Sequence, residues 1–403
     1  MSFSLEGVRI IQTAAMAAGP MGGRLLADWG ADVICIEHIV RQGMVSRRHI
    51  SQFPNRRVIA SDINYNAQNT GRNKRSIALD LSKDDGRKII YKLLENSDVL
   101  LTNFRMRELE KFKLEYETLS KLNPGIICAH LTGYGMKGPD KNTPGYGPMA
   151  SDARSGLLHL LKAPGVEPVQ FPLAYADYIT GMSLALGIMT ALYVREKTGE
   201  GQEVNTSLFN TGVWAVSSDL SATLVTGQDR QALSRKDTGS PLMNIYETKD
   251  ERWLYLSVGE GTWSNFCHAL GQEMERDPRF ATPESRLENH FELYDVMREV
   301  FLSKTLDEWS PRLNEAMVTW APLQNLPEVI NDQQARANDF FIPLDHPTHG
   351  RIEVVANPVK LSKTKEEIRM PAPEPGQHTD EVLSEFGYTD KEIAQLREQE
   401  VIQ

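Results

Sequence analysis

The stretch "AAGPMGGRLLADWGADVICIE", residues Ala17–Glu37, decides the fold class. Its first part combines helix-forming residues with apolar positions on one side, which predicts a helix. Ala31–Glu37 is a near-continuous apolar run of strand length, and a short β-rich run, Val8–Gln12, precedes the helix. A strand, a helix and a second strand in this order predict a βαβ unit with parallel strands.

The alternation of strand and helix patterns continues outward from this unit. The strand-like runs "RSIALDL", "DVLLTNF" and "GIICAHLTGYG" alternate with the helical patterns "KDDGRKIIYKLLENS" and "YETLSKLNP". We therefore expect an α/β protein with a large Rossmann-like domain, whose parallel sheet is covered on both faces. Polar residues follow the expected strands at Glu37, Asn103 and Thr132–Gly135, and ligands collect at the carboxyl ends of such strands.

The sequence texture changes between about Gln228 and Asn325. Two β-rich runs, "MNIYE" and "WLYLSV", are joined by the polar turn "TKDER", and amphipathic helical patterns follow. We predict that residues 226–325 form a smaller α+β domain. Residues 1–225 would then be the N-terminal part of the large domain, and residues 326–403 its C-terminal part with a linker.

Composition excludes several classes of function. The 403 residues carry a net charge of −10, which argues against nucleic acid as a partner. The longest apolar run, Met182–Val194, is shorter than the roughly 18 residues of a membrane span. The N-terminus lacks the basic and apolar regions of a signal peptide. We expect a cytoplasmic protein without a membrane partner.

Several familiar motifs are missing. "GPMGGR", Gly19–Arg24, invites a dinucleotide-binding interpretation, but the GxGxxG spacing is absent and a tight turn between strand and helix is favoured. The chain has no Walker A sequence, no HExxH, no GxSxG and no Cys/His cluster. We therefore expect no catalytic metal.

One carboxylate stands out. Asp177 lies in the apolar stretch "LAYADYITGM", just before Met182–Val194. From its surroundings alone a helix N-cap is favoured over a catalytic carboxylate, although carboxylates do form covalent intermediates. Two basic clusters, Thr70–Ser76 and Thr102–Lys111, each lie beside an expected strand and are either solvated faces or phosphate contacts.

A resemblance to a known family favours the catalytic interpretation of Asp177 over the helix N-cap. The segments that carry it run over nearly the whole chain: "LEGVRII", "NTGRNKRSIALDL", "YETLSKLNPGIICAHLTGYGMKGP", "VREKTGEGQEVNTSLF" and "PAPEPGQHTDEVLSEFGYTDKEI". The chain resembles the class III CoA-transferases, the family of formyl-CoA transferase and carnitine CoA-transferase. "LLTNFR", "YETL" and "GYGMKGPDK" are most similar to the branch acting on 2-hydroxy acids and aryl-lactates, and "FPLAYADYITG" to carnitine CoA-transferase.

The resemblance implies an activity and a set of site residues. Asp177 matches the family's nucleophile, so CoA would pass from an acyl-CoA donor to a carboxylic acid through a covalent aspartyl-CoA thioester. Coenzyme A is then carried as part of the substrate and product, and no metal takes part. The implied CoA contacts are Met16, Ala17, His38, Gly71, Arg72, Asn73, Lys74, Asn103, Phe104, Arg105, Lys111 and Tyr146.

Some of these positions depart from the family pattern. His38 and Lys111 stand where an arginine is common. The glycine-rich loop of formyl-CoA transferase is matched here by "KDTGSPL", in which Gly239 is the single glycine.

The resemblance also implies an interlocked homodimer whose large domain is built from both chain ends. Two alternatives stay open. A relative with the same fold, α-methylacyl-CoA racemase, needs a histidine facing the aspartate, and Tyr146 stands in its place. A non-catalytic, CoA-binding subunit of a hetero-oligomeric transferase would lack the aspartate, and here Asp177 is present.

Overall fold

The structure, a computed structural model, describes residues 3–39, 61–172, 174–230, 233–237, 240–364 and 366–403. It separates into two compact units. The first comprises Met1–His159, Val169–Asp229 and Ala337–Gln403, and the second comprises Leu160–Pro168 and Arg230–Arg336. The first unit therefore uses both ends of the chain.

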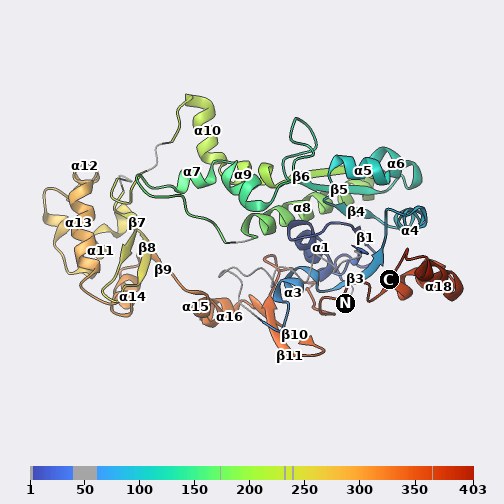
Figure 1. Ribbon diagram of the computed structural model, residues 1–403. Coiled ribbons are helices and arrows are strands. Elements are labelled where there is room, and N and C mark those ends of the chain that lie inside the picture. Colours follow the sequence, from blue (N-terminus) through green and yellow to red (C-terminus); the bar gives the residue numbers. More distant parts are fainter. Residues whose placement is uncertain (1–2, 40–60, 173, 231–232, 238–239, 365) are drawn as a thin grey trace. The chain divides into compact units, whose positions relative to one another are not determined.

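A six-stranded sheet forms the centre of the first unit (Figure 1). Its strand order is β3-β2-β1-β4-β5-β6, and every neighbouring pair is parallel. This is the doubly wound order of dinucleotide-binding folds, in which the strand order reverses beside β1. The strands are β1 (Arg9–Gln12), β2 (Asp32–His38), β3 (Lys74–Leu79), β4 (Val99–Thr102), β5 (Ile127–Thr132) and β6 (Glu203–Ser207).

Helices follow the strands of the first unit, and a two-stranded antiparallel hairpin, β10 (Phe341–His346) and β11 (Gly350–Val355), belongs to its C-terminal part. The helices are α1 (Ala18–Asp28), α3 (Tyr65–Gly71), α4 (Asp84–Glu95), α5 (Met106–Phe112), α6 (Tyr116–Leu122), the π-helix η2 (Pro148–Ala153), α7 (Leu157–Leu161), α8 (Tyr175–Thr198), α9 (Leu208–Ala215), α10 (Ser217–Thr226), α17 (Thr379–Glu385) and α18 (Asp390–Glu398).

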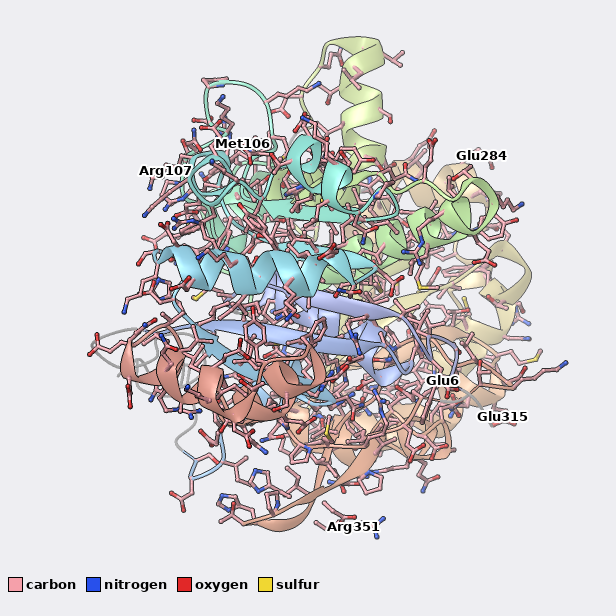
Figure 2. The ribbon with its side chains drawn as sticks, turned by 90° about the vertical axis from the view of Figure 1, so that its right-hand side faces the viewer. Glu6, Met106, Arg107, Glu284, Glu315 and Arg351 are labelled. Carbon is pink, nitrogen blue, oxygen red and sulfur yellow. The ribbon has the colours of Figure 1, made fainter. Side chains whose placement is uncertain are left out.

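Alternate residues of the strands point to opposite faces of the sheet, as strand geometry requires. Ile11, Ile34 and Leu100 pack with α4, α5, α6, α17 and α18. Their chain neighbours Ile10 and Val33 pack with α1 and α8 on the other face. Figure 2 shows α4, α17 and α18 in front of the strands, with Met106 and Arg107 labelling the start of α5. The predicted α/β class, with a parallel sheet covered on both faces, is confirmed.

The C-terminal segment is fastened to the beginning of the chain by polar contacts. The side-chain amide nitrogen of Asn73 donates to the carbonyl of Glu367 at 2.7 Å, and its side-chain oxygen accepts from the backbone N–H groups of Arg369 and Met370. Arg24 donates to Asn357 at 2.8 Å. These bonds explain why one compact unit contains both chain ends.

Helices α1 and α8 pack at very short distance because glycines face each other. A Cβ atom on Gly22 would lie 2.8 Å from the carbonyl oxygen of Gly181, and a Cβ on Gly181 would lie 2.4 Å from that of Ala18. Gly22 and Gly19 lie within α1, so "GPMGGR" provides a helix crossing. The prediction that this segment forms a tight turn was therefore wrong.

Helix α8 spans 24 residues and is therefore longer than the apolar run Met182–Val194 that lies within it. Among the described residues it is the one helix long and apolar enough to cross a membrane by length and composition. A core helix of a globular protein passes the same criterion, and α8 supplies Leu184, Ala185 and Ile188 to the core beside α1.

The second unit is an antiparallel sheet covered by helices. Its strand order is β7-β8-β9, and Tyr246, Leu254 and Leu256 pack with Phe266 and Trp309 in one core. The elements are β7 (Met243–Glu247), β8 (Trp253–Ser257), the 3-10 helix η3 (Glu260–Thr262), α11 (Trp263–Leu270), the 3-10 helix η4 (Met274–Arg276), α12 (Pro283–Glu288), α13 (His290–Phe301), α14 (Leu306–Glu315), β9 (Thr319–Pro322), α15 (Leu326–Asn331) and α16 (Gln333–Ala337).

Candidate active site

Asp177 is the third residue of α8 and is half-buried. The residue that caps the helix is Ala174, and no side chain caps the first turn. The interpretation of Asp177 as the N-cap was therefore wrong, because the helix begins two residues earlier. A carboxylate in the first turn still gains from the partial positive charge at the helix N-terminus, which favours its ionised form.

The backbone in front of Asp177 is in an unusual conformation. Ala174 has a φ of +65°, in the left-handed region that favours glycine. Met16, in the loop after β1, also has a positive φ of +70°. Strained residues of this kind cluster at functional sites, where the surrounding structure holds them.

Gly147 faces the carboxylate of Asp177. A Cβ atom at this position would lie 2.9 Å from Oδ2 of Asp177 and 3.3 Å from the Cβ of Ala176. Glycine therefore allows the segment before η2 to approach the acid closely. Tyr146 directly precedes Gly147 in the chain, so this contact also brings one predicted CoA contact near Asp177.

The charge of Asp177 is tuned by its surroundings. The pKa of Asp177 is raised to about 6. Burial is the largest cause of this shift, and the negative charge of Asp152 acts in the same direction. Asp152 lies in η2 and is 3% exposed. Its Oδ1 atom has no hydrogen-bond partner in the part of the chain that the structure describes.

The loop after β1 and the end of β4 are locked together. Asn103 accepts a hydrogen bond from the backbone N–H of Ala15 at 3.1 Å and donates one to its carbonyl at 2.9 Å. The hydroxyl groups of Thr13 and Thr102 lie 2.8 Å apart. The structure thus brings the predicted contacts Met16, Ala17 and Asn103 together at the carboxyl edge of the sheet, with Met16 exposed.

A group of aromatic and basic side chains continues this edge at the start of α5. Phe104 packs on Phe112 with 5.6 Å between ring centroids, and Lys111 lies over the Phe112 ring. Arg105 pairs with Glu108, which raises the pKa of Arg105, and the charge of Tyr146 acts in the same direction. Phe104, Arg105, Lys111 and Tyr146 therefore lie in one neighbourhood.

The predicted contacts Arg72, Asn73 and Lys74 lie in the interior instead. Arg72 is fully buried and pairs with Asp28 at 2.7 Å, and Asn73 donates to the same carboxylate. The Lys74 ammonium donates to the side chain of Gln12 at 2.9 Å. Gln12 in turn donates to the carbonyl of Ala14, so Lys74 stabilises the loop after β1 through the side chain of Gln12.

The other predicted residues are dispersed. Gly71 is the last residue of α3 and is buried. His38 is exposed at the carboxyl end of β2, with Nδ1 2.8 Å from the Ile39 carbonyl oxygen. The CoA-binding roles expected of Gly71 and His38 stay predictions. Gly239, the glycine of the segment that resembles the glycine-rich loop of formyl-CoA transferase, lies outside the described residues.

Sequence reasoning missed two residues at this site, Gly147 and Asp152. Asp152 follows the small residues of "PMASD", so it carries the same signal that singled out Asp177, an acid in an apolar setting. Gly147 gives no such signal, because only the fold places it against a carboxylate. Among the described residues no group of three or more histidine, cysteine, aspartate or glutamate side chains could hold a metal ion.

Comparison with known proteins bears directly on this site. The chain is 32% identical over 403 residues to the (R)-2-hydroxy-4-methylpentanoate CoA-transferase of Clostridioides difficile, covering 99% of both chains. It is 32% identical over 401 residues to the cinnamoyl-CoA:phenyllactate CoA-transferase of Clostridium sporogenes, covering 97% of this chain and 95% of that one.

A solved structure, that of a CAIB/BAIF family protein from Brucella suis, matches with a TM-score of 0.83 and 26% identity, over 96% of this chain and 100% of that one. The sequence profile of CoA-transferase family III matches residues 5–379. The doubly wound sheet and the sequence agree, and the chain belongs to CoA-transferase family III, the class III CoA-transferases.

Proposed function

We propose that this enzyme moves CoA from an acyl-CoA donor to a 2-hydroxy or aryl-lactate type of carboxylic acid, through a covalent aspartyl-CoA thioester on Asp177. The observation that carries the proposal is the position of Asp177 in the first turn of α8, against Gly147. The names of the two relatives, which act on a 2-hydroxy acid and on phenyllactate, support this class of acceptor.

The reaction proceeds by four acyl transfers without a net change of protons. A carboxylate oxygen of Asp177 attacks the thioester carbon of the donor, the C–S bond breaks, and a mixed anhydride and CoA thiolate form. The thiolate attacks the aspartyl carbon of the anhydride and releases the donor acid, which leaves an aspartyl-CoA thioester. The acceptor carboxylate then attacks this thioester, and the returning thiolate converts the second anhydride into the new acyl-CoA and free Asp177.

The surroundings of Asp177 suit a carboxylate nucleophile. Partial burial removes water that would weaken its nucleophilicity and hydrolyse the anhydride. The N-terminus of α8 stabilises negative charge at the same place. CoA would lie along the carboxyl edge of the sheet, where Met16, Asn103 and Phe104 are gathered and where Arg105 and Lys111 supply positive charge.

We further propose that two copies of the chain form an interlocked homodimer. The first unit carries large apolar side chains that are strongly exposed on α8, α9 and α10: Leu186, Tyr193, Trp214, Leu224 and Val225. A group of exposed apolar residues of this size favours a protein interface.

An exchange assay tests the proposed function. Purified enzyme is mixed with acetyl-CoA or butanoyl-CoA and a panel of 2-hydroxy, aryl-lactate and unsubstituted acids, and new CoA thioesters are detected by mass. We expect transfer by the wild type and none by Asp177→Ala, with Asp140→Ala as the control acid. Full transfer activity in Asp177→Ala would contradict the role proposed for Asp177. Deuterium exchange at the acyl α-carbon without any transfer would favour a racemase instead.

A further inference from the structure

The first turn of α8, which carries Asp177, has no cap of its own. Its N-cap is Ala174, and no side chain caps the turn. The first N–H groups of a helix have no partner within the helix, so an uncapped helix end frays easily. A misplacement of about 1 Å at a reacting group can cost a factor of about 100 in rate. The contacts that hold this turn in place therefore bear on the reactivity of Asp177.

Tyr178, the residue after Asp177, attaches this turn to another helix of the first unit. Its hydroxyl oxygen accepts a hydrogen bond from the side-chain amide nitrogen of Asn69 at 3.0 Å. The ring of Tyr178 is half-buried and packs against the core that α1 and α8 share. Because Asn69 belongs to α3, the bond joins the start of α8 to a residue 109 positions away along the chain.

Helix α3 is attached to its surroundings on two sides. The side-chain oxygen of Gln68, which is buried, accepts a hydrogen bond from the backbone N–H of Ala372 in the C-terminal segment at 2.9 Å. Arg72, the C-cap of α3, pairs with Asp28 of α1 at 2.7 Å. Asn69 therefore donates from an element that is bound both to α1 and to the C-terminal segment.

The bond from Asn69 opposes a motion that the glycine crossing of α8 does not prevent by itself. The contact of Gly181 with α1 sets how closely the two helices approach, but one point of contact leaves rotation about the helix axis open. Asp177 and Tyr178 point about 100° apart around that axis, so a rotation of the turn moves both side chains together. A hydrogen bond at the hydroxyl of Tyr178 acts far from the axis and resists this rotation.

We propose that Tyr178 is a positioning residue, whose hydrogen bond from Asn69 holds the carboxylate of Asp177 in the orientation that attacks the thioester carbon. This inference rests on the proposed function and adds the pair of side chains that orients the nucleophile. Tyr178 acts through Asp177 and forms no bond to the acyl group. Burial raises the pKa of the Tyr178 hydroxyl, and the charge of Asp177 acts in the same direction, so the acceptor is neutral while Asp177 is ionised.

The experiment removes this hydrogen bond from each side. Tyr178→Phe deletes the hydroxyl group and keeps the ring in the core, and Asn69→Ala deletes the donor on α3. Rates are measured with butanoyl-CoA and the 2-hydroxy or aryl-lactate acid that the wild type accepts best, and are corrected for the folded fraction given by thermal melting. We expect kcat to fall about 10-fold in both variants, within the range of a small misplacement, and the donor KM to stay near the wild-type value.

Two further measurements separate positioning from a merely structural role. The double variant, Asn69→Ala with Tyr178→Phe, should lose no more activity than either single variant, because all three lack the same hydrogen bond. The loss should persist at pH 8, where Asp177 is ionised, since an effect on its pKa alone would disappear there. Tyr255→Phe is the matched control, because it makes the same change at an exposed tyrosine of β8, and its kcat should equal that of the wild type.

Each outcome has a definite meaning. A wild-type kcat in Tyr178→Phe, additive losses in the double variant, a loss that disappears at pH 8 or a change confined to KM overturns this inference, while transfer by the wild type still supports the proposed function. A wild type that forms no CoA thioester with any acid contradicts the proposed function, and this inference with it. If Tyr178→Phe does not fold, Asn69→Ala decides by its kcat, its KM and its activity at pH 8.

Discussion

At the scale of single residues, Asp177 is under two opposing influences. Burial and the charge of Asp152 raise its pKa to about 6, whereas the N-terminus of α8 favours the ionised form. The nucleophile is the ionised carboxylate, so the pKa sets the pH below which the enzyme loses activity. Two measurements follow from this and from the contact with Gly147.

The first prediction concerns pH. Below about pH 6 Asp177 becomes protonated, so log kcat/KM should fall with a slope of one, and above that pH it should level off. Asp152→Asn removes a charge that raises this pKa, so its profile should shift to lower pH. The rate is measured between pH 4.5 and 8 with one donor and acceptor pair, and a profile flat down to pH 5 would contradict the assignment.

The second prediction concerns Gly147. Gly147→Ala places a Cβ 2.9 Å from Oδ2 of Asp177 and forces the carboxylate to move. A misplacement of this kind should lower kcat/KM about 10- to 100-fold. Gly259→Ala is the matched control, because a Cβ there meets no atom within 4 Å and the residue has a φ of −83°. Equal activity of both variants would show that the close approach is unimportant.

At the scale of elements, the crossing of α1 and α8 sets the position of Asp177. The two helices touch through Gly22 and Gly181, one turn beyond the nucleophile. Glycines at this crossing let the backbone of α8 lie against α1, which fixes the first turn of α8 relative to the sheet. The contact therefore serves both stability and the geometry of the site.

The third prediction tests this crossing. A methyl group on Gly181 would lie 2.4 Å from the carbonyl oxygen of Ala18, so the two helices must separate. The overlap should outweigh the gain of about 1 kcal/mol in helix propensity. We expect Gly181→Ala to lower the free energy of unfolding by at least about 1 kcal/mol, measured by urea denaturation. Glu196→Ala, at an exposed position on another face of the same helix, should have a small effect, and equal stability of the two variants would contradict a steric role for this crossing.

The limits of sequence reasoning are clear in the same elements. The alternation of apolar runs and amphipathic helical patterns predicted the parallel sheet correctly. A strand buried on both faces is apolar throughout, and a helix that covers the sheet is apolar on one side, so both leave a direct pattern in the sequence. "GPMGGR" was misread, because a glycine in a turn and a glycine in a helix crossing look alike until the partner helix is known. Asp177 was expected to be the N-cap of its helix, but α8 begins two residues earlier, at Tyr175. The N-cap is Ala174, an alanine with a positive φ, which no sequence rule predicts.

At the scale of the whole molecule, the first unit depends on a buried charge network that joins the two chain ends. Asp28 in α1 pairs with Arg72 and with Arg24, whose side chains are almost fully buried. Arg24 and Asn73, both partners of Asp28, also bind the C-terminal segment around Asn357 and Glu367. Nothing in the sequence indicated that Arg72 is part of this buried network and not a CoA contact, because its partner Asp28 lies 44 positions away along the chain.

The fourth prediction follows from that network. Asp28→Ala leaves the guanidinium groups of Arg24 and Arg72 buried without their carboxylate, which should cost about 3–5 kcal/mol of unfolding free energy. The loss is measured by urea denaturation of the whole protein. Asp84→Ala, which removes an exposed acid paired with Arg87, should leave the unfolding midpoint near that of the wild type. Equal midpoints for the two variants would refute a central role for Asp28.

The fifth prediction concerns assembly. If α10 lies in a homodimer interface, the native mass should be about twice 45.3 kDa, and Leu224→Asp with Val225→Asp should reduce it. Light scattering coupled to size exclusion gives this mass directly. Leu287→Asp, at an exposed leucine of the second unit, is the control. A wild type that elutes as a monomer would contradict the proposed dimer.

The covalent intermediate on Asp177 can be tested most directly by trapping it and measuring the mass of the modified peptide. The wild type is incubated with butanoyl-CoA alone, quenched, treated with hydroxylamine and digested. We expect a hydroxamate on Asp177, formed from its CoA thioester or anhydride, and none in protein incubated without donor or in Asp177→Ala. An unmodified Asp177 in an enzyme that still transfers CoA, or a modification on another residue, would contradict it.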